Sequence, residues 1–410
     1  MLLLISINLP FAVKAETEIE FWTINLSPQF DDYFLNKISE YEENNPDLKI
    51  IWEDINFSSI NQQLRYRIAE GNVPELVNLS PQLMASLLEA GLLYPISTLE
   101  NNYSDIYLPL LWENGYYQGE YYAFPWYLSS KLMAYNQEIF KIADLNPAEP
   151  PTTKTELFEI SAEITEKTGV YGLMHQIKIL PEFIEAGIEI FKEEGNQLKA
   201  AFNTPEALEI IKRYQKLAAE GVIPADTLND LAILFTPSQF LKKIESESKY
   251  LRDNTYLAVI PAAKEGVINA ALMNLVIPAA ADYKEEAADF GYFITSPASQ
   301  QEFSQLAAVL PSAVSNTNNK AENNSNENKK REIISLGEGN SLEDQARKIL
   351  MEQLPHNQDL TLIHPQAPQL IKIMDEQFAR AFASKISAAE ALKQMELGWN
   401  EILRNTRGDK

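Results

Sequence analysis

The chain has 410 residues, more than one compact core usually holds, so its length predicts two domains or two lobes. A net charge of -24 at pH 7 opposes contact with phosphate backbones and anionic lipid, which argues against nucleic acid and membrane surfaces as partners. The absence of cysteine excludes disulfides, thiolate metal sites, cysteine nucleophiles and an N-terminal lipid-anchored cysteine.

The first fifteen residues predict export. Leu2 to Val13 is almost wholly apolar and too short to span a bilayer. Val13 and Ala15 are small residues at the spacing that signal peptidase cleavage requires. We therefore predict a signal peptide over residues 1–15, although it lacks a basic start, and a periplasmic or secreted mature protein. A buried first strand is the alternative interpretation of this segment.

Strand and helix patterns then alternate. Short apolar runs predict strands, and apolar residues at helical spacing before a stop signal predict helices. In chain order these are strand Ile19–Thr23, helix Pro28–Asn44, strand Leu48–Trp52, a helix from Ser58 or Ser59 to Gly71, strand Glu75–Leu79 and helix Pro81–Ala90. This order is typical of an open, mainly parallel α/β sheet.

The second half repeats the theme less regularly. Its predicted elements are helices Thr153–Thr168 and Thr204–Glu220, strands Leu231–Phe235, Tyr256–Ile260 and Leu272–Pro278, and a helix from Ser296. Residues 315–331 are asparagine-rich without apolar periodicity, which predicts a solvated low-complexity insert. Capping-box patterns at Ser341 and Ser387 begin two helices of the tail.

Motifs for catalysis or metal binding are missing from the sequence. His175, His356 and His364 are not spaced as metal ligands, so we predict no metal site. No P-loop, dinucleotide fingerprint or nucleophile elbow occurs, and no acid pair stands out from the many acidic residues. We therefore predict neither a cofactor nor an enzyme.

Neutral polar and aromatic residues follow the predicted strands. Thr23 and Asn25 follow the first strand, and Ser80 and Gln82 follow the third. Ligands of open α/β sheets bind at the carboxyl ends of strands. Hydroxyls, amides and aromatic faces suit an uncharged polar ligand such as a sugar.

The stretch GEYYAFPWYLSSKLMAYN, residues 119–136, gathers six aromatic residues around one proline. We expect Tyr121, Phe124 and Tyr135 to pack around the strands. Trp126 and Tyr127 follow a short apolar run and a proline, so we expect their rings to face a ligand cleft.

Several of these segments together resemble the family 1 extracellular solute-binding proteins of ABC importers, the maltose-binding-protein-like group. The matching segments are EFWT, PELVNLSPQLMASLLEAGLLYPI, GEYYAFPWYLSSKLMAYNQEIF, FNTPEALEIIKRYQKLAAEGVI, FITSPASQQEF and SAAEALKQMELGWNEIL. The resemblance implies a periplasmic binding protein-like type II fold, with two α/β lobes joined by a hinge and a ligand cleft between them. It places residues 16–128 and 269–310 in a first lobe and residues 129–268 and 311–410 in a second.

The resemblance also implies a function and a site. The chain would capture a small solute, most plausibly a carbohydrate, by hinge closure and deliver it as a monomer to the membrane subunits of an ABC permease. The predicted ligand residues are Thr23, Asn25, Ser80, Gln82, Trp126, Tyr127, Ser129, Pro237, Ser238 and Asn274. The alternatives are a secreted carbohydrate-active enzyme and a divergent binding protein that acts as a sensor or scaffold.

Two departures from the family pattern concern the second lobe. Pro237 is kept, but Thr236 and Ser238 replace a glycine and a tryptophan. A Gly-Gly pair before the late strand is also missing, since alanines and Leu272-Met273 stand there. Side chains in place of glycine narrow a site, so we expect a smaller ligand than a typical oligosaccharide, or a protein that no longer transports.

Overall fold

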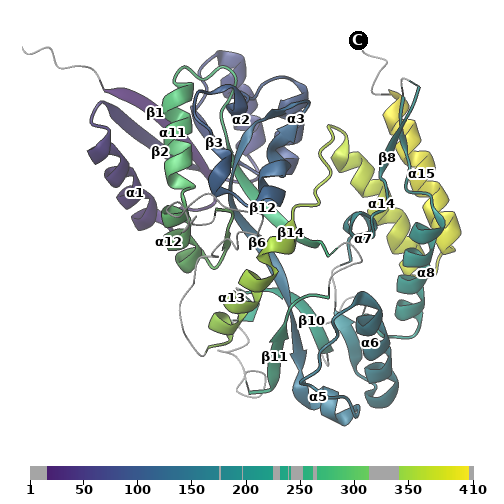
Figure 1. Cartoon of the computed structure of the whole chain (residues 1–410). Helices are drawn as coiled ribbons and strands as arrows, with labels where there is room; N and C mark the ends of the chain where they lie inside the picture. Colours follow the sequence, from purple (N-terminus) through teal and green to yellow (C-terminus); the bar gives the residue numbers. More distant parts are fainter. Residues whose placement is uncertain are drawn as a thin grey trace, which may run out of the picture.

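The computed structural model describes residues 16–174, 177–195, 197–224, 231–238, 240–241, 253–261, 266–313 and 341–405. The predicted signal peptide, His175 and the asparagine-rich insert lie outside these residues. Helices and strands are arranged in two lobes that stand side by side and are joined by long strands (Figure 1). The α/β class predicted from the sequence is therefore confirmed.

The first lobe is built on a mixed sheet. Its strands, in spatial order, are β2 (Leu48–Ile55), β1 (Thr17–Ile24), β3 (Leu76–Leu79) and β12 (Ile268–Val276). The first three are parallel, as predicted, whereas β12 runs antiparallel to β3. One face packs on α1 (Asp31–Asn44), α11 (Lys284–Ile294) and α12 (Pro297–Ala307), and the other on α2 (Ile60–Glu70) and α3 (Pro81–Glu89).

The second lobe has its own sheet and core. Its strands β7 (Tyr171–Met174) and β10 (Leu231–Pro237) are parallel, and β11 (Thr255–Ala258) pairs with β6 (Ala123–Asn136). A hairpin of β8 (Phe191–Glu194) and β9 (Gln197–Ala200) lies beside α15 (Ala388–Asn405). The helices around the core are α5 (Gln137–Ile142), α6 (Lys154–Thr168), α7 (Ile179–Glu185), α8 (Pro205–Ala219), α14 (Ala367–Phe382) and α15 (Ala388–Asn405).

One strand belongs to both lobes. β6 (Ala123–Asn136) pairs with β12 along its first half and with β10 and β11 along its second half. Side chains alternate across a strand. Leu128, Ser130 and Leu132 are accordingly buried, whereas Ser129 and Lys131 between them remain partly accessible. The middle of β6, where the chain passes from one lobe to the other, is called the crossing below. It therefore has one packed face and one open face.

The packed face of the crossing is covered by α13 (Leu342–Gln353), which begins at the predicted capping box of Ser341. Behind the strand, the Gln353 side-chain amide donates to Ser130 Oγ at 2.9 Å, and Asn357 Nδ2 donates to the same oxygen at 3.0 Å. Short elements around the crossing are α4 (Pro109–Trp112), β4 (Tyr116–Tyr117), β5 (Glu120–Tyr121), β13 (Leu310–Pro311) and β14 (Asn357–Gln358).

The segment that follows α12 packs on the first lobe. Leu310 and Pro311 pair with β6, and the Ser312 hydroxyl donates to the carbonyl oxygens of Pro125 and Trp126. The sequence-based boundary assigned everything after Leu310 to the second lobe, and residues 311–313 depart from it. The other boundaries of the lobes stay a prediction.

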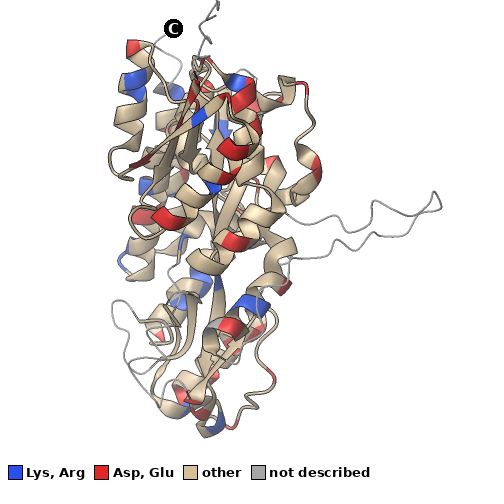
Figure 2. Cartoon of the chain, turned by 90° about the vertical axis from the view of Figure 1, so that its left-hand side faces the viewer, with Lys and Arg blue, Asp and Glu red and all other residues tan. Residues whose placement is uncertain are grey.

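Charged residues of both signs are spread over the helices of both lobes (Figure 2). Acidic residues predominate, with 58 Asp and Glu against 34 Lys and Arg in the whole chain. Among the helices that the structure describes, none combines the length and apolarity needed to cross a membrane.

A buried aspartate accepts hydrogen bonds from the backbone of two different segments. Asp359 Oδ2 accepts the Leu272 backbone N–H of β12 at 2.8 Å, and its Oδ1 accepts the Thr361 N–H at 2.8 Å. The residue is only 6% exposed. Burial raises the pKa of this carboxyl, and the hydrogen bonds from Leu272 and Thr361 oppose the shift only in part.

We expect Asp359 to make stability depend on pH with a defined sign. Because its folded pKa is raised, the folded state takes up the proton first, so this stabilisation is present below the folded pKa and is lost as the pH rises through it. The wild type should therefore gain stability relative to Asp359→Asn when the pH falls from about 7.5 to about 5. Thermal unfolding of both proteins at both pH values measures this, and an unchanged difference would contradict it.

Candidate functional site

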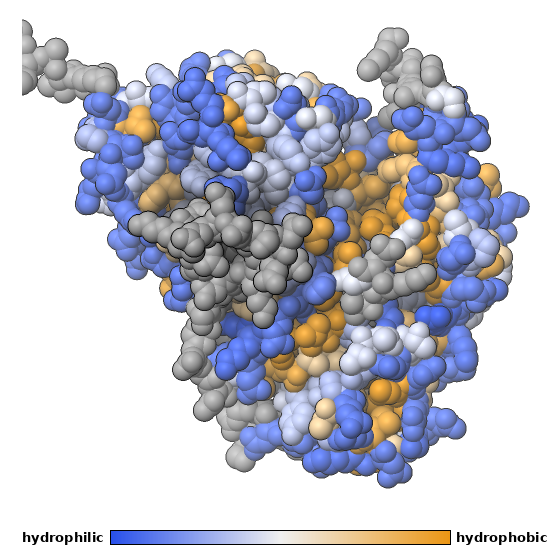
Figure 3. All heavy atoms as spheres, viewed as in Figure 1, coloured by the Kyte–Doolittle hydropathy of each residue, from blue (hydrophilic) through white to orange (hydrophobic). Residues whose placement is uncertain are grey.

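A cavity of about 290 Å³ opens between the second lobe and the open face of the crossing strands. Hydrophobic residues gather in the hollow between the lobes (Figure 3). Residues far apart in the sequence line the cavity, including Ser129, Lys131, Phe158, Tyr214, Phe235 and Asn269. Its volume lies near the lower end of the roughly 300–1,000 Å³ typical of small-molecule sites.

The floor of the cavity is a row of residues from three neighbouring strands. Lys131 of β6 pairs with Pro237 of β10 on one side. On the other side, Ser130 pairs with Ala270, which places Asn269 of β12 opposite Lys131 in the antiparallel register. Asn269 and Ala271 are exposed, whereas Ile268, Ala270 and Leu272 are buried. Strand alternation thus turns this row toward the cavity.

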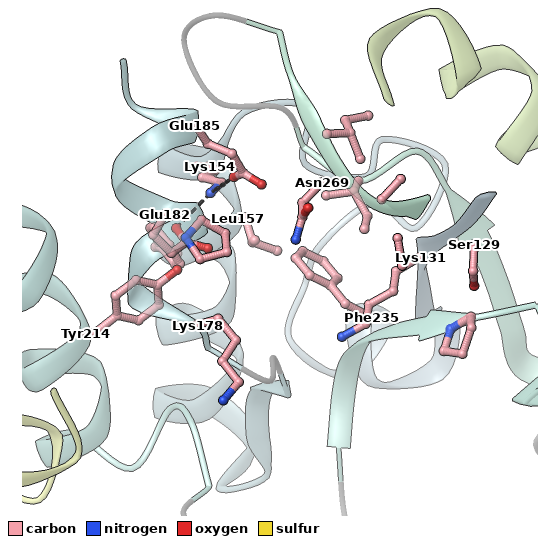
Figure 4. A pocket seen from close by; sticks show the side chains of 17 residues that line it. Ser129, Lys131, Lys154, Leu157, Lys178, Glu182, Glu185, Tyr214, Phe235 and Asn269 are labelled. Atoms are coloured by element: carbon pink, nitrogen blue, oxygen red, sulfur yellow. Dashed lines mark hydrogen bonds and ion pairs between the residues drawn. The ribbon is translucent and has the colours of Figure 1, made fainter. Parts of the chain in front are cut away.

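The wall on the second-lobe side is aromatic. Phe158 of α6 and Tyr214 of α8 meet edge to face, with ring centroids 5.5 Å apart. Phe235 of β10 lies nearer to the floor (Figure 4). Burial, with a smaller contribution from Glu182, raises the pKa of the Tyr214 phenol well above its ordinary value. Tyr214 is therefore neutral. Because Tyr214 is 1% exposed and Phe158 and Phe235 are each 8% exposed, these rings border the cavity with their edges. Such apolar edges can contact the C–H groups of a sugar.

A buried ion-pair cluster completes the same wall. Lys154, at the start of α6, places its Nζ 2.7 Å from Glu182 Oε2 and 2.5 Å from Glu185 Oε2, both on α7 (Figure 4). Burial alone would lower the pKa of Lys154, but the two carboxylates outweigh it and raise that pKa. The lysine is therefore held as a cation whose charge the two glutamates already neutralise.

The structure brings two of the predicted ligand residues into this cavity. Ser129 and Pro237 both line it, from β6 and β10. Thr23 and Asn25 lie at the carboxyl end of β1, as predicted, but Thr23 is fully buried and donates to Asp54 Oδ1 at 2.6 Å. Asn25 Oδ1 accepts the Phe57 N–H at 2.9 Å.

The predicted residues around α3 have other environments. Ser80 caps the helix by accepting the Leu83 N–H, and Gln82 is exposed in its first turn. Asn274 is fully buried under this helix, with Nδ2 3.5 Å from Met84 Sδ. None of these three residues lines the cavity described above. Their role in ligand binding stays a prediction.

Trp126 does not face the cleft. Its ring is 0% exposed and packs in the first-lobe core, stacked on Phe303 with centroids 5.7 Å apart and also touching Phe21 and Phe34. An irregularity in the β6–β12 register, between Met273 and Asn274, lies opposite this residue. The prediction for Trp126 is therefore wrong.

Two further predicted residues differ from expectation. Tyr127 is half-buried and packs against Trp126 and Phe303. Ser238 is 2% exposed, and its hydroxyl donates to the Ala308 carbonyl oxygen of the first lobe at 3.2 Å. Ser238 follows Pro237 in the chain yet does not line the cavity. Its role as a ligand residue stays a prediction. Phe124 and Tyr135 are buried, as predicted.

The charged and amide residues of the cavity were not found from the sequence. Lys131, Lys154 and Asn269 each stand among ordinary polar residues, and no local motif marks them. The alternation of Ser129 and Lys131 between leucines in LSSKL was the one usable signal, because it predicts that both side chains share a face. Within the described residues, no group of three or more His, Asp or Glu is arranged to hold a metal ion.

The known proteins that this chain resembles are described as binding proteins. A family model described as bacterial extracellular solute-binding protein matches residues 37–330. A diacetylchitobiose binding protein, DasA, of Streptomyces coelicolor is 22% identical over 48% of this chain, which spans 46% of that relative's length. An arabinooligosaccharide-binding protein of Halalkalibacterium halodurans is 23% identical over 68% of this chain and 67% of its own.

Solved structures share the whole fold. The crystal structure of the cyclic alpha-maltosyl-1,6-maltose binding protein of Arthrobacter globiformis superposes with a TM-score of 0.77. That match covers 95% of this chain and 100% of the other, at 18% sequence identity. The two-lobe arrangement described above is therefore the fold of periplasmic binding proteins of type II, as the sequence resemblance implied.

Proposed function

Because the chain belongs to the bacterial extracellular solute-binding proteins, we propose that it captures a small carbohydrate between its lobes and delivers it to the membrane subunits of an ABC importer. The observation that carries the proposal is the cavity between the crossing strands and the second lobe. Aromatic rings of Phe158, Tyr214 and Phe235 stand on one side, and polar groups from the crossing strands form the floor. This is the combination that sugar rings and their hydroxyls require.

The cavity also supports a binding role in preference to catalysis. Its only acidic lining residues among those described are Glu182 and Glu185, and both are engaged by Lys154. A glycoside hydrolase of the usual kind needs one carboxylic acid and one carboxylate on opposite sides of the scissile bond. The relatives named above are likewise described as binding proteins. We propose that the mature protein acts outside the cytoplasm and has no catalytic activity of its own.

A thermal-shift screen of the mature protein with sugars, polyols, amino acids and metal ions tests the proposal. A ligand present at 100 times its dissociation constant stabilises the folded state by about 2.7 kcal/mol. We expect mono- or disaccharides to give such shifts, because the cavity is small. Stabilisation by another class of solute, with none from any sugar, would overturn the carbohydrate assignment.

A cavity-filling variant shows whether a stabilising sugar binds in this cavity. Ala271 is exposed on the cavity side of β12, so Ala271→Trp should occupy the space without disturbing a core. We expect this variant to lose the sugar-induced shift while its unliganded melting temperature changes little. Lys192→Trp, at an exposed position of β8, is the matched control and should keep the shift.

A further inference from the structure

Lys131 differs from the other lysines that line the cavity. Lys154 is paired with two glutamates, and Lys178 Nζ lies 2.8 Å from Asp375 Oδ2. Lys131 forms no ion pair or side-chain hydrogen bond with any residue that the structure describes. It is also partly buried, and burial lowers the pKa of its ammonium group. A cation in this setting lacks the partner that normally offsets its loss of hydration.

A second polar group beside Lys131 is also available for a ligand. Asn269 precedes Ala270 on β12, and since Ala270 pairs with Ser130, continuation of the antiparallel register places Asn269 opposite Lys131. Its Oδ1 accepts the Leu360 N–H at 3.2 Å. That bond fixes the amide so that Nδ2 points into the cavity, where no described residue accepts from it (Figure 4). One ammonium and one amide donor therefore line the same cavity, on either side of the Phe235 ring (Figure 4).

The rest of the cavity indicates what kind of anion would fit. Phe235 lies beside Lys131, and Tyr214 stands across from it (Figure 4). Phe158 packs against Tyr214. These rings pack in the second-lobe core and are only 1–8% exposed, and a small inorganic anion would leave their edges at the cavity uncovered. The volume of about 290 Å³ accommodates a sugar of one or two rings, by comparison with general ligand sites. The ligand should thus combine a carboxylate with a sugar ring.

Resting on the proposed carbohydrate function, we propose that the solute is an acidic saccharide whose carboxylate pairs with Lys131 Nζ and accepts a hydrogen bond from Asn269 Nδ2. A carboxylate offers two oxygens, and charge-assisted hydrogen bonds are among the strongest in proteins. The sugar ring then lies toward Phe235 and the aromatic wall. A neutral sugar of the same size would leave Lys131 partly buried and without a charged partner among the described residues.

Matched pairs of sugars test the inference directly. The probes are galacturonate against galactose, glucuronate against glucose, and digalacturonate against its methyl ester, titrated by calorimetry into the mature protein. We expect the acidic member of at least one pair to bind at least about 30-fold more tightly than the neutral member, since leaving a buried charge unpaired costs about 2 kcal/mol or more. Lys131→Met should weaken that binding by a similar factor, and Lys131→Arg should retain part of it.

A second measurement does not depend on the choice of sugar. In the unliganded protein Lys131 is a partly buried cation without a partner among the described residues, so Lys131→Met should leave the melting temperature unchanged or raise it by about 1–2 °C. A residue that served the fold would instead lower it. Lys212→Met, at an exposed position of α8, is the control and should bind the acidic sugar like the wild type.

The outcomes separate this inference from the proposed function. If neutral sugars bind as tightly as their acids, or if Lys131→Met binds the acidic sugar with unchanged affinity, the proposal of an acidic ligand is overturned. The proposed sugar-binding role is then retained. If acetate or inorganic phosphate binds as tightly as the acidic sugars, the site is a general anion site and the inference also fails. If no saccharide of either kind binds, the proposed function and the inference fail together.

Discussion

Trp126→Ala is expected to lower the free energy of unfolding by about 3–5 kcal/mol, as large-to-small changes of buried aromatic residues do. The indole is 0% exposed and contacts Phe21, Phe34 and Phe303, so its removal leaves a cavity inside the first-lobe core. Chemical denaturation of the unliganded protein measures the change. A loss below about 1 kcal/mol would show that the ring is not part of the core.

Trp126→Phe is the matched control. The indole N–H has no hydrogen-bond partner among the described residues, so its removal sacrifices no bond. We expect this variant to retain most of the stability and to bind sugar as the wild type does. If Trp126→Phe lost sugar binding while its stability was unchanged, Trp126 would have to be part of the ligand site.

Lys154→Met is expected to be comparably destabilising, by about 3–5 kcal/mol, because it removes the cation of a buried ion-pair cluster. The Glu182 and Glu185 side chains are only 8% and 11% exposed and both bind Lys154. Without the ammonium group, two carboxylates remain buried side by side. Urea denaturation at neutral pH measures the loss, which should become smaller in acid as the carboxylates take up protons.

Restoring neutrality is the control for this prediction. In the variant that combines Lys154→Met with Glu182→Gln and Glu185→Gln, no buried charge is left unpaired, and replacing a whole buried ion pair is often close to neutral. We expect it to recover most of the lost stability. Equal instability of the single and triple variants would show that Lys154 acts through packing of its alkyl chain rather than through its charge.

Sequence patterns predicted the first lobe well because its elements are short, regular and bounded by local signals. Ser80 before Pro81 caps α3, and Gly71 ends α2 in the left-handed conformation, as its position suggested. β6 was not predicted as a single strand of 14 residues. Its aromatic cluster and Pro125 gave no clear alternation, and the two sheets that it pairs with lie far away in the sequence.

The candidate site was harder to predict because it depends on contacts between distant segments. Of the predicted ligand residues, Ser129 and Pro237 line the cavity, and their role in ligand binding stays a prediction. Trp126 follows a proline and a short apolar run, which favour a position at the rim of the cleft, whereas the residue lies inside a continuous strand. The environment of Lys131 requires β10, β12 and the second-lobe helices to be in place, and no local pattern contains that information.

The continuity of β6 through both sheets has a mechanical consequence for ligand capture. When the lobes rotate about the crossing strands, a point moves in proportion to its distance from the axis. Ser129 and Lys131 lie in β6, the strand that pairs with strands of both lobes. Rotation about this strand would displace the outer ends of the lobes further than these two residues. A solute bound at Lys131, as we propose, would therefore be attached to the segment that joins the lobes before the lobes enclose it.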